Sequence, residues 1–343
     1  MRLFVQIPCL NEEATLAEVI RDVPRAVEGI DEVRVLVVDD GSSDRTAEVA
    51  RQAGADYVIR RPRTQGLARA FTLGIATCLE LGADIIVNTD GDHQYRGEDI
   101  PRLIGPILEG WADIAIGDRR VASVAHFSAL KRRLQVLGSR AVSVLSGVRL
   151  PDVTSGFRAY SREGALRLNV FSSFSYTLET IFLAGSHRIP VAHVPVGVNR
   201  PRRPSRLFGS LQGYLEKSAA TILRVYTLYE PLRTFFWVGA LLGGLGLLGI
   251  LRFLSFYLAG TGAGHVQSLV LSGALLVMGV QVWMLGVLAD LISINRRLGE
   301  EILYRVRRDG RGGPDPRALD RAPRRRPGAG RDEGVPAAGG TLR

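Results

Sequence analysis

The sequence has little cysteine and none of the short motifs that mark common nucleic-acid-binding folds. Its two cysteines, Cys9 and Cys78, fall in a predicted strand and a predicted helix, so no disulfide framework is expected and a reducing compartment is favoured. No zinc-finger, helix-turn-helix or aromatic RNA-binding signature accompanies the formal charge of +10, so no nucleic-acid partner is expected. Met1 leads directly into the strand-like stretch RLFVQIP, so no signal peptide is expected either. The positive charge indicates instead an anionic lipid or a phosphate ligand.

The first part of the chain alternates short apolar runs with helical segments. The apolar runs predict strands at residues 3–7, 33–38, 57–59, 85–87 and 114–116, and helices are predicted between them. Continuous apolar strands separated by helices are typical of a mostly parallel sheet covered on both faces. The sequence therefore predicts an α/β domain, whose ligands would bind beyond the carboxyl ends of the strands.

Acidic residues follow two of these predicted strands. Asp39 and Asp40 end the second strand, and Asp90 and Asp92 follow the fourth. Two carboxylates one residue apart repel each other unless something positive lies between them. Oxygen ligands favour a hard divalent cation such as Mg²⁺ or Mn²⁺, which usually keeps waters and binds substrate phosphates. Gln94 offers a further oxygen.

Two apolar stretches lie near the end of the chain, at about residues 235–258 and 268–292. Each has about 24 residues, enough to cross a hydrocarbon core of about 30 Å, although a buried hairpin in a soluble domain is the alternative. The connecting stretch AGTGAGH has no Lys or Arg, whereas Arg224 and Arg233 precede the pair and Arg296 and Arg297 follow it. The positive-inside rule therefore predicts that both flanks are cytoplasmic.

These patterns divide the chain into four parts. An α/β domain is predicted for residues 1–208, and an amphipathic juxtamembrane helix for residues 209–233, either in the membrane interface or docked on the domain. Residues 234–293 are predicted to form a two-helix membrane anchor, and residues 294–343 a basic, mostly disordered cytoplasmic tail. The paired spans offer a surface for a homo-oligomer, but the sequence leaves the oligomeric state open.

Six motifs occur in order with ordinary spacing: IPCLNEE, VVDDGSSDRT, TQGLARAFTLGI, NTDGDHQY, IGDRR and DVTSGFRAYSREG. Together they resemble those of family-two glycosyltransferases of the GT-A fold. With the two late spans, the chain resembles the polyprenyl-phosphate, or dolichol-phosphate mannose synthase-like, members. The resemblance implies metal-dependent, inverting transfer of one sugar from a UDP- or GDP-sugar to a polyprenyl phosphate at the cytoplasmic membrane face.

The resemblance also implies roles for individual residues. The donor nucleotide would contact Pro8, Asn11, Glu12, Asp39 and Ser42. A cation, Mg²⁺ or Mn²⁺, would be held by Asp90, Asp92 and Gln94, and the catalytic residues would be Asp92, Arg119 and Arg158. The acceptor phosphate would bind among Arg119, Arg132, Arg133, Arg158, Arg202 and Arg206. Arginine suits phosphate because its planar fork presents several donors.

Three further residues have roles that the sequence leaves open. Asp152 and Ser155 are expected to orient the sugar or the loop before Arg158, and Glu179 is either catalytic or the partner of an arginine. A lipid monophosphate is already anionic near neutral pH and needs no strong base. An alternative hydroxyl acceptor, on a glycolipid or polysaccharide, would need a carboxylate such as Glu179 or Asp152 as its base. An inactive membrane scaffold is another alternative, because fold alone does not fix function.

Overall fold

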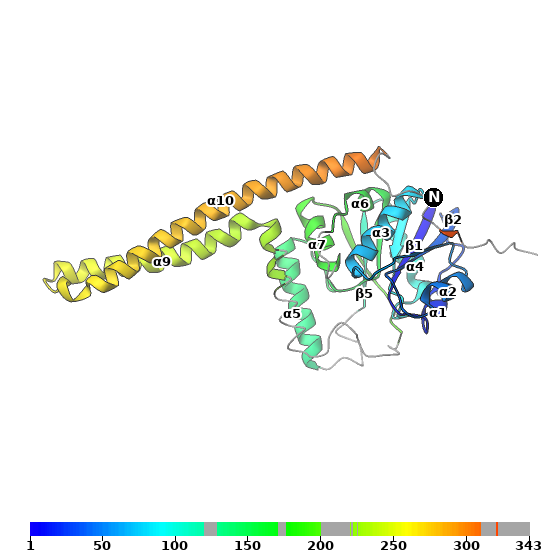
Figure 1. Ribbon diagram of the computed structural model, residues 1–343, viewed down its shortest axis with the longest axis horizontal. Coiled ribbons are helices and arrows are strands. Elements are labelled where there is room, and N and C mark those ends of the chain that lie inside the picture. The colour runs from blue at the N-terminus through cyan, green and yellow to red at the C-terminus, as the bar shows by residue number, and fades with distance from the viewer. Residues whose placement is uncertain are drawn as a thin grey trace, which may run out of the picture.

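The structure is a computed structural model that describes residues 1–119, 129–170, 176–199, 220, 222–224, 226–309 and 320–321. Side chains are described for all of these except residues 129–137, 262, 263, 320 and 321. Figure 1 shows an α/β domain from which a long pair of helices projects. The described part of the chain thus combines the two kinds of structure that the sequence predicts.

The α/β domain is built on one sheet with the strand order β7-β5-β6-β4-β1-β2-β3-β8. Strands β1 to β4 are parallel to their neighbours among themselves, β5 is parallel to β7, and β6 is antiparallel to both β4 and β5. The mostly parallel sheet and its five predicted strands are confirmed, whereas β6, β7 and the short β8 were not predicted. The strands are β1 (Arg2–Cys9), β2 (Glu32–Asp39), β3 (Tyr57–Arg60), β4 (Ile85–Asn88), β5 (Ile114–Asp118), β6 (Arg158–Ser161), β7 (Val191–Pro195) and β8 (Asp320–Arg321).

Helices cover both faces of this sheet, because successive side chains of a strand point to opposite faces. Leu3 on β1 belongs to one apolar core, with residues of α1, α2 and α4, while Phe4 belongs to the other, with residues of α3, α6 and α7. The helices of the domain are α1 (Leu16–Asp22), α2 (Thr46–Gln52), α3 (Leu67–Glu80), α4 (Ile100–Leu108), α5 (Ala129–Ser146), α6 (Arg162–Arg167) and α7 (Tyr176–Ser186), with a 3₁₀ turn at Gly97–Asp99.

The two projecting helices are α9 (Pro231–Leu258) and α10 (Val266–Arg308), joined through a 3₁₀ turn at Gly262–His265. Both are long and apolar enough to cross a membrane, and only 17% and 11% of their most apolar windows are buried. A buried core hairpin is therefore not favoured. Glycines bring the backbones together: a Cβ on Gly279 would lie 2.6 Å from the backbone nitrogen of Gly243.

The predicted boundaries of the last two parts differ from the structure. Helix α10 continues to Arg308, so residues 294–308, predicted to begin a disordered tail, are helical. Charged pairs one turn apart, such as Glu301 with Arg305, and the burial of Tyr304 support this extension. Of the predicted juxtamembrane helix, residues 220, 222–224 and 226–229 are helical and α9 begins at Pro231, while most of the remainder lies outside the described residues.

Candidate active site

The acidic strand ends meet at one edge of the sheet. Strand β1 lies between β2 and β4, so Asp39 and the loop of Asp90 and Asp92 flank its carboxyl end. Glu12 approaches from the loop after β1: its Cγ would lie 3.2 Å from a Cβ added to Gly91. The sequence prediction that these acids gather beyond the carboxyl ends of the strands is therefore confirmed by the geometry.

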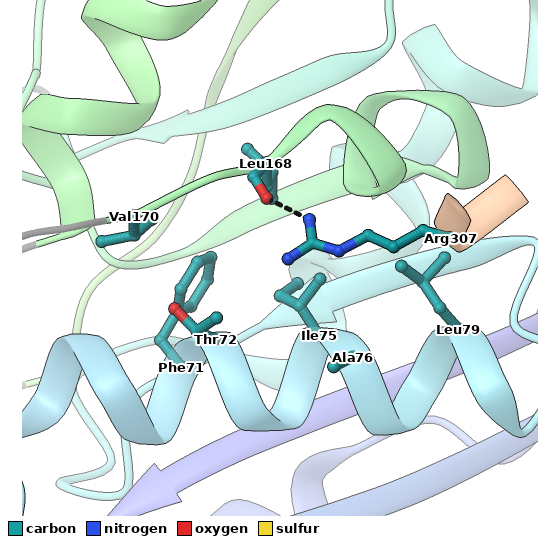
Figure 2. Close-up of a pocket in the computed structure, with 8 residues that line it drawn as sticks. All are labelled: Phe71, Thr72, Ile75, Ala76, Leu79, Leu168, Val170 and Arg307. Atoms are coloured by element: carbon teal, nitrogen blue, oxygen red, sulfur yellow. Dashed lines mark hydrogen bonds between the residues drawn. The ribbon is translucent and has the colours of Figure 1, made fainter. Parts of the chain in front are cut away.

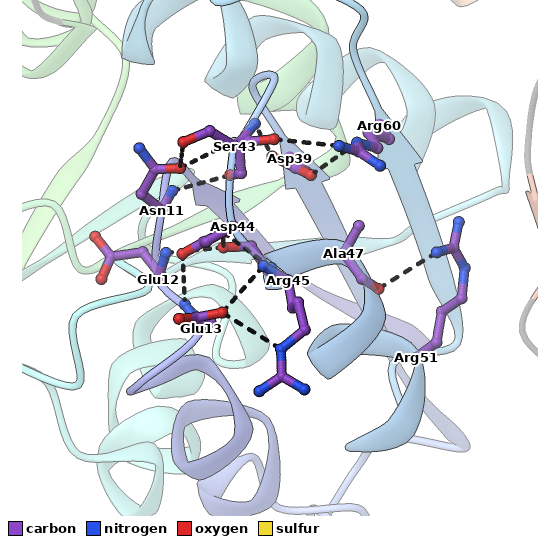
Figure 3. Close-up of polar contacts among 12 residues, drawn as sticks. Asn11, Glu12, Glu13, Asp39, Ser43, Asp44, Arg45, Ala47, Arg51 and Arg60 are labelled. Carbon is purple, nitrogen blue, oxygen red and sulfur yellow. Dashed lines mark hydrogen bonds and ion pairs between the residues drawn. The ribbon is translucent and has the colours of Figure 1, made fainter.

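Among the residues predicted to contact the donor nucleotide, hydrogen bonds tie the loop after β1 to the loop after β2 (Figure 3). The backbone N–H of Asn11 donates to Ser42 Oγ at 2.9 Å, and the Asn11 side-chain oxygen accepts from the backbone N–H of Ser43 at 2.9 Å. Asp39 Oδ1 accepts from the backbone N–H of Ser42 at 2.8 Å. The structure thus brings Asn11, Asp39 and Ser42 together, with Pro8 on β1 and Glu12 beside them.

The second carboxylate oxygen of Asp39 is available for a ligand. Asp39 Oδ2 is buried and accepts no hydrogen bond within the described structure, and its nearest cation is Arg60 Nε at 3.7 Å. A surface pocket lined by Gly41, Ser42, Arg60, Arg61 and Pro62 lies beside it. The sequence analysis did not single out Arg60 and Arg61, although the stretch RRPR directly follows a predicted strand.

A loop near this pocket is held by Asp40, the acid next to Asp39. Its carboxylate accepts from the backbone N–H groups of Gln65 and Gly66, at 3.1 Å and 2.7 Å, and from Arg61 Nη1 at 3.0 Å. Gly66 has φ of 101°, which glycine adopts without strain. Asp40 is therefore a positioning residue for this loop, and its carboxylate is already engaged.

The residues predicted to hold a cation carry a surplus of negative charge. Asp90 is partly exposed as a whole residue, but its carboxyl group is enclosed by the surrounding chain, and none of the described residues donates a hydrogen bond to it. Burial raises the pKa of Asp90 to about 7, Asp92 adds to the rise and Arg119 opposes it. No cluster of three or more His, Cys, Asp or Glu side chains capable of holding a metal occurs among the described residues. Two carboxylates and one amide oxygen nevertheless fit Mg²⁺ or Mn²⁺, which take further ligands from phosphate and water.

A buried polar network that the sequence analysis missed lies directly beneath Asp90. Asn88, the last residue of β4, accepts from Gln6 Nε2 at 3.0 Å and donates to the carbonyl oxygen of Gly156 at 2.8 Å and the hydroxyl of Tyr176 at 2.9 Å. A Cβ on Gly156 would lie 2.7 Å and 2.9 Å from the two Asp90 carboxylate oxygens. The network thus holds the backbone of Gly156, which has no side chain, close to the Asp90 carboxylate.

Gly156→Ala is therefore expected to displace the Asp90 carboxylate and to lower the sugar transfer that the resemblance implies about 10- to 100-fold, because small errors of position at a reacting centre are costly. The initial rate of transfer, measured with radiolabelled donor, checks this. Gly105→Ala on α4 is the matched control, since nothing lies within 4 Å of its added Cβ, and it should keep the original rate. Equal rates for the two variants would contradict the role given to Gly156.

Among the described side chains, Arg119 is the arginine that lies against the predicted cation ligand Gln94. Its Nη1 lies 3.5 Å from Gln94 Oε1, while Nε and Nη2 donate to the two oxygens of Asp152 at 2.6 Å and 3.0 Å. Nη2 also donates to Thr154 Oγ1 at 2.7 Å. Although burial opposes it, Arg119 keeps the pKa of Asp152 below its ordinary value. One side of the guanidinium is thus fixed by Asp152, and the other faces the cation loop.

Arg158 does not fit its predicted contact with phosphate. The side chain is fully buried, and it donates to the carbonyl oxygens of Val153, Ser155 and Thr177 and to the hydroxyl of Thr180. The physical reason is that Arg158 begins β6, an inner strand, so its guanidinium points into the domain. Arg158 therefore ties the loop before β6 to α7, as a positioning residue.

The remaining predicted residues are placed less directly. Ser155 is buried beside Arg158, and Glu179 is buried on α7. Burial raises the pKa of Tyr229, which lies two residues before α9, and the negative charge of Glu179 adds to this rise. Arg132 and Arg133 lie in α5, but their side chains are outside the described part. The acceptor arginines at 202 and 206 fall in the segment 200–219, also outside it.

Comparison with known proteins defines the class. Residues 4–167 match the sequence profile described as glycosyl transferase family 2. The undecaprenyl-phosphate mannosyltransferase of Micrococcus luteus is 30% identical over 224 residues, which cover 62% of this chain and 90% of that protein. Glycosyltransferase AglJ of Haloferax volcanii is 30% identical over 302 residues, covering 84% and 93%. Together with the site geometry, these similarities define the chain as a glycosyltransferase.

Solved structures agree on the fold. Glucosyl-3-phosphoglycerate synthase from Mycobacterium tuberculosis, crystallised with Mn²⁺, UDP and glucosyl-3-phosphoglycerate, superposes with a TM-score of 0.51 at 22% identity over 66% of this chain and 78% of that chain. The α/β domain thus has the GT-A fold that the resemblance implied. The chain belongs to glycosyltransferase family 2 and is similar to its polyprenyl- and dolichyl-phosphate sugar synthases.

Proposed function

We propose that this glycosyltransferase moves one sugar from a UDP- or GDP-sugar to a polyprenyl phosphate at the cytoplasmic face of a membrane, with inversion at the transferred carbon. The observation that carries the proposal is the placement of Asp90 and Asp92 beside Arg119 at the donor edge of a domain that continues into two apolar helices. Relatives named as an undecaprenyl-phosphate mannosyltransferase and a polyprenol monophosphomannose synthase support this acceptor class.

The donor would lie across the carboxyl edge of the sheet. The buried Asp39 Oδ2 and the pocket at Arg60 suit the polar edge of the nucleoside, and Asp90, Asp92 and Gln94 would hold a divalent cation. Such a cation supplies Lewis-acid stabilisation of the departing diphosphate. Arg119, fixed by Asp152, adds a preorganised positive charge on the same side.

A phosphate acceptor agrees with the environment of the candidate bases. A hydroxyl nucleophile would need a carboxylate poised over the sugar. Glu179 is buried within the domain, and Asp152 is fully engaged by Arg119 and Thr154, so neither is placed as a base. A phosphate monoester carries its own negative charge and needs positioning by cations. Arg132, Arg133 and the arginines at 202 and 206 stay the predicted ligands for it.

The test is incubation of membranes containing the full chain with radiolabelled UDP- and GDP-sugars and polyprenyl phosphate. Label from one donor is expected in the organic phase, is expected to disappear with EDTA, and should return with Mn²⁺ or Mg²⁺. The same membranes with a polyprenol in place of the phosphate serve as the control and should stay unlabelled. Labelling of the polyprenol, or transfer that survives EDTA, would contradict the proposal.

A further inference from the structure

One face of α10 carries buried residues from Ser272 to Tyr304. Five of its six buried residues recur every seven positions, at Ser272, Gly279, Gly286, Ser293 and Glu300, and the sixth is Tyr304. Within the apolar part this face packs on α9: a Cβ on Gly286 would lie 2.7 Å from the Cβ of Phe235. A seven-residue repeat keeps one side of a helix against a neighbour over many turns. Beyond Ser293 the same face leaves α9 and meets the catalytic domain, which Figure 1 shows as α10 running on past α9 towards α6.

The first contacts of this extension are with α7 and with Tyr229, two residues before α9. The guanidinium of Arg296 lies 4.2 Å from the centre of the Tyr229 ring, and that ring stacks on Phe182 of α7 with centroids 6.1 Å apart. One turn later, Glu300 Oε2 lies 3.2 Å from His187 Nε2, just after α7. Arg296 and Glu300 therefore attach α10 to the side of α7 that faces the anchor.

The last two turns of α10 dock on α6 and α3. The hydroxyl of Tyr304 lies 2.8 Å and 3.1 Å from the carboxylate oxygens of Glu163 on α6, and the Arg167 guanidinium lies 4.4 Å from the centre of the Tyr304 ring. Arg307 Nη1 donates to the carbonyl oxygen of Leu168 at 2.7 Å (Figure 2). Figure 2 also shows its aliphatic stem lying over α3, where it lines a small cavity with Ile75.

The opposite face of the same segment is solvated. Arg305 has 73% of its side chain exposed and pairs with Glu301 of its own helix, and Ile302 and Leu298 are also exposed. The contacts of Arg296, Glu300, Tyr304 and Arg307 thus follow helical spacing on a single face. This pattern distinguishes a docked helix from a helix that passes the domain without packing on it.

The docking surface lies at the edge of the sheet opposite the acidic site. Strand β6 is antiparallel to β4, pairing Arg158 with Asn88 at the carboxyl end of β4 and Ser161 with Ile85 at its start. Helix α6 follows Ser161 directly, so it lies at the far edge. The 16 residues from Ser293 to Arg308 extend about 24 Å at 1.5 Å per residue. Helix α10 therefore extends beyond the start of α9 to the side of the catalytic domain that lies opposite the acidic site.

We propose that residues 293–308 of α10 form a brace that fixes the tilt of the catalytic domain relative to the bilayer, with Tyr304 and Arg307 as its positioning residues. The domain is attached at the start of α9 and again, far from that point, at α6 and α3. Two separated attachments prevent rotation about the first one. A lipid phosphate is confined to the bilayer surface, so a fixed tilt keeps the donor sugar at the height where the phosphate can attack.

The functional test compares two acceptors of the same chemistry, and this part rests on the proposed function. The double variant Tyr304→Ala/Arg307→Ala in the full chain is assayed with long-chain polyprenyl phosphate in vesicles and with a short, water-soluble prenyl phosphate. Transfer to the vesicle acceptor is expected to fall about tenfold, because reacting groups lose their alignment, and transfer to the soluble acceptor less than twofold. Arg305→Ala is the matched control on the solvated face and should change neither. Equal losses on both acceptors would show a role in folding only, and no loss on either would overturn the brace.

A second measurement tests the proposed brace independently of sugar transfer. A fluorophore on Trp111→Cys, an exposed position after α4, reports its distance to a dye on the lipid head groups of vesicles. The unbraced double variant is expected to show a shifted or broader distance distribution, while Arg305→Ala keeps the original one. Identical distributions would overturn the brace even in an active enzyme. If the chain labels no prenyl phosphate, the proposed function fails, yet the distances still decide whether α10 orients the domain.

Discussion

Asp92→Asn is expected to lower sugar transfer by roughly 10³-fold, and Asp90→Asn by a similar factor. A neutral amide is a weaker ligand for a hard cation, and loss of the cation removes several kcal/mol of stabilisation from the departing diphosphate. At about 1.4 kcal/mol for each factor of ten, that loss corresponds to two to three orders of magnitude. The initial rate with radiolabelled donor, at saturating Mn²⁺, measures the effect.

Binding of Mn²⁺ supplies an independent readout for the same variants. Electron paramagnetic resonance of free Mn²⁺, titrated with protein and nucleoside diphosphate, is expected to show weaker binding by both variants. His93→Asn is the control in the same loop, because the His93 side chain contacts α1 instead of the predicted cation site. Its Nε2 lies 2.5 Å from Asp22, and its Nδ1 lies 3.4 Å from Glu18. Asparagine also tolerates the positive φ of 60° at this position. Asp92 variants that bind Mn²⁺ as tightly as the original chain would remove this residue from the cation site.

The fold and the acidic edge were predictable because both depend on local patterns. Continuous apolar runs place the buried parallel strands, and the residue at the end of each run must emerge at the carboxyl edge. Asp39 and Asp90 could therefore be placed together without knowing any side-chain contact. Strands β6 and β7 were missed because their runs are short and mixed, and β6 begins with an arginine.

The burial of arginines could not be predicted in the same way. Arg119 and Arg158 both belong to motifs of the family, and both were expected to face phosphate. The structure separates them: Arg119 lies beside Gln94, whereas Arg158 is enclosed by four backbone and hydroxyl oxygens. The enclosure of Arg158 depends on the antiparallel course of β6, a non-local pairing that residue spacing along the chain does not reveal.

The extension of α10 beyond the apolar run was missed because hydropathy was the only signal used to end the helix. The apolar run stops near Ile292, but the seven-residue repeat of buried positions continues through Ser293 and Glu300. These positions change from small residues to charged ones as the neighbour changes from α9 to the catalytic domain. The spacing is present in the sequence, yet the partner that makes Glu300 and Tyr304 buried is a tertiary contact.

Arg119→Ala is expected to be the most destabilising of the site variants and to abolish most transfer. The Arg119 side chain is 9% exposed and that of Asp152 fully buried, so the variant would leave an unpaired buried carboxylate. Breaking a buried pair in this way costs about 3–5 kcal/mol. Arg119→Lys should recover part of the stability and little of the activity, because an ammonium cannot reproduce the two-pronged contact with Asp152.

The free energy of unfolding, measured by denaturant titration of the detergent-solubilised chain, tests the stability of these variants. Arg25→Ala, which removes a half-exposed partner of Asp56, is the control and should cost less than about 1 kcal/mol, since Arg34 still pairs with Asp56. The double variant Arg119→Ala/Asp152→Asn removes both charges and is expected to be more stable than Arg119→Ala alone, yet equally inactive. Recovery of transfer in the double variant would show that Arg119 acts only by neutralising Asp152, and that the face turned to Gln94 contributes nothing to the reaction.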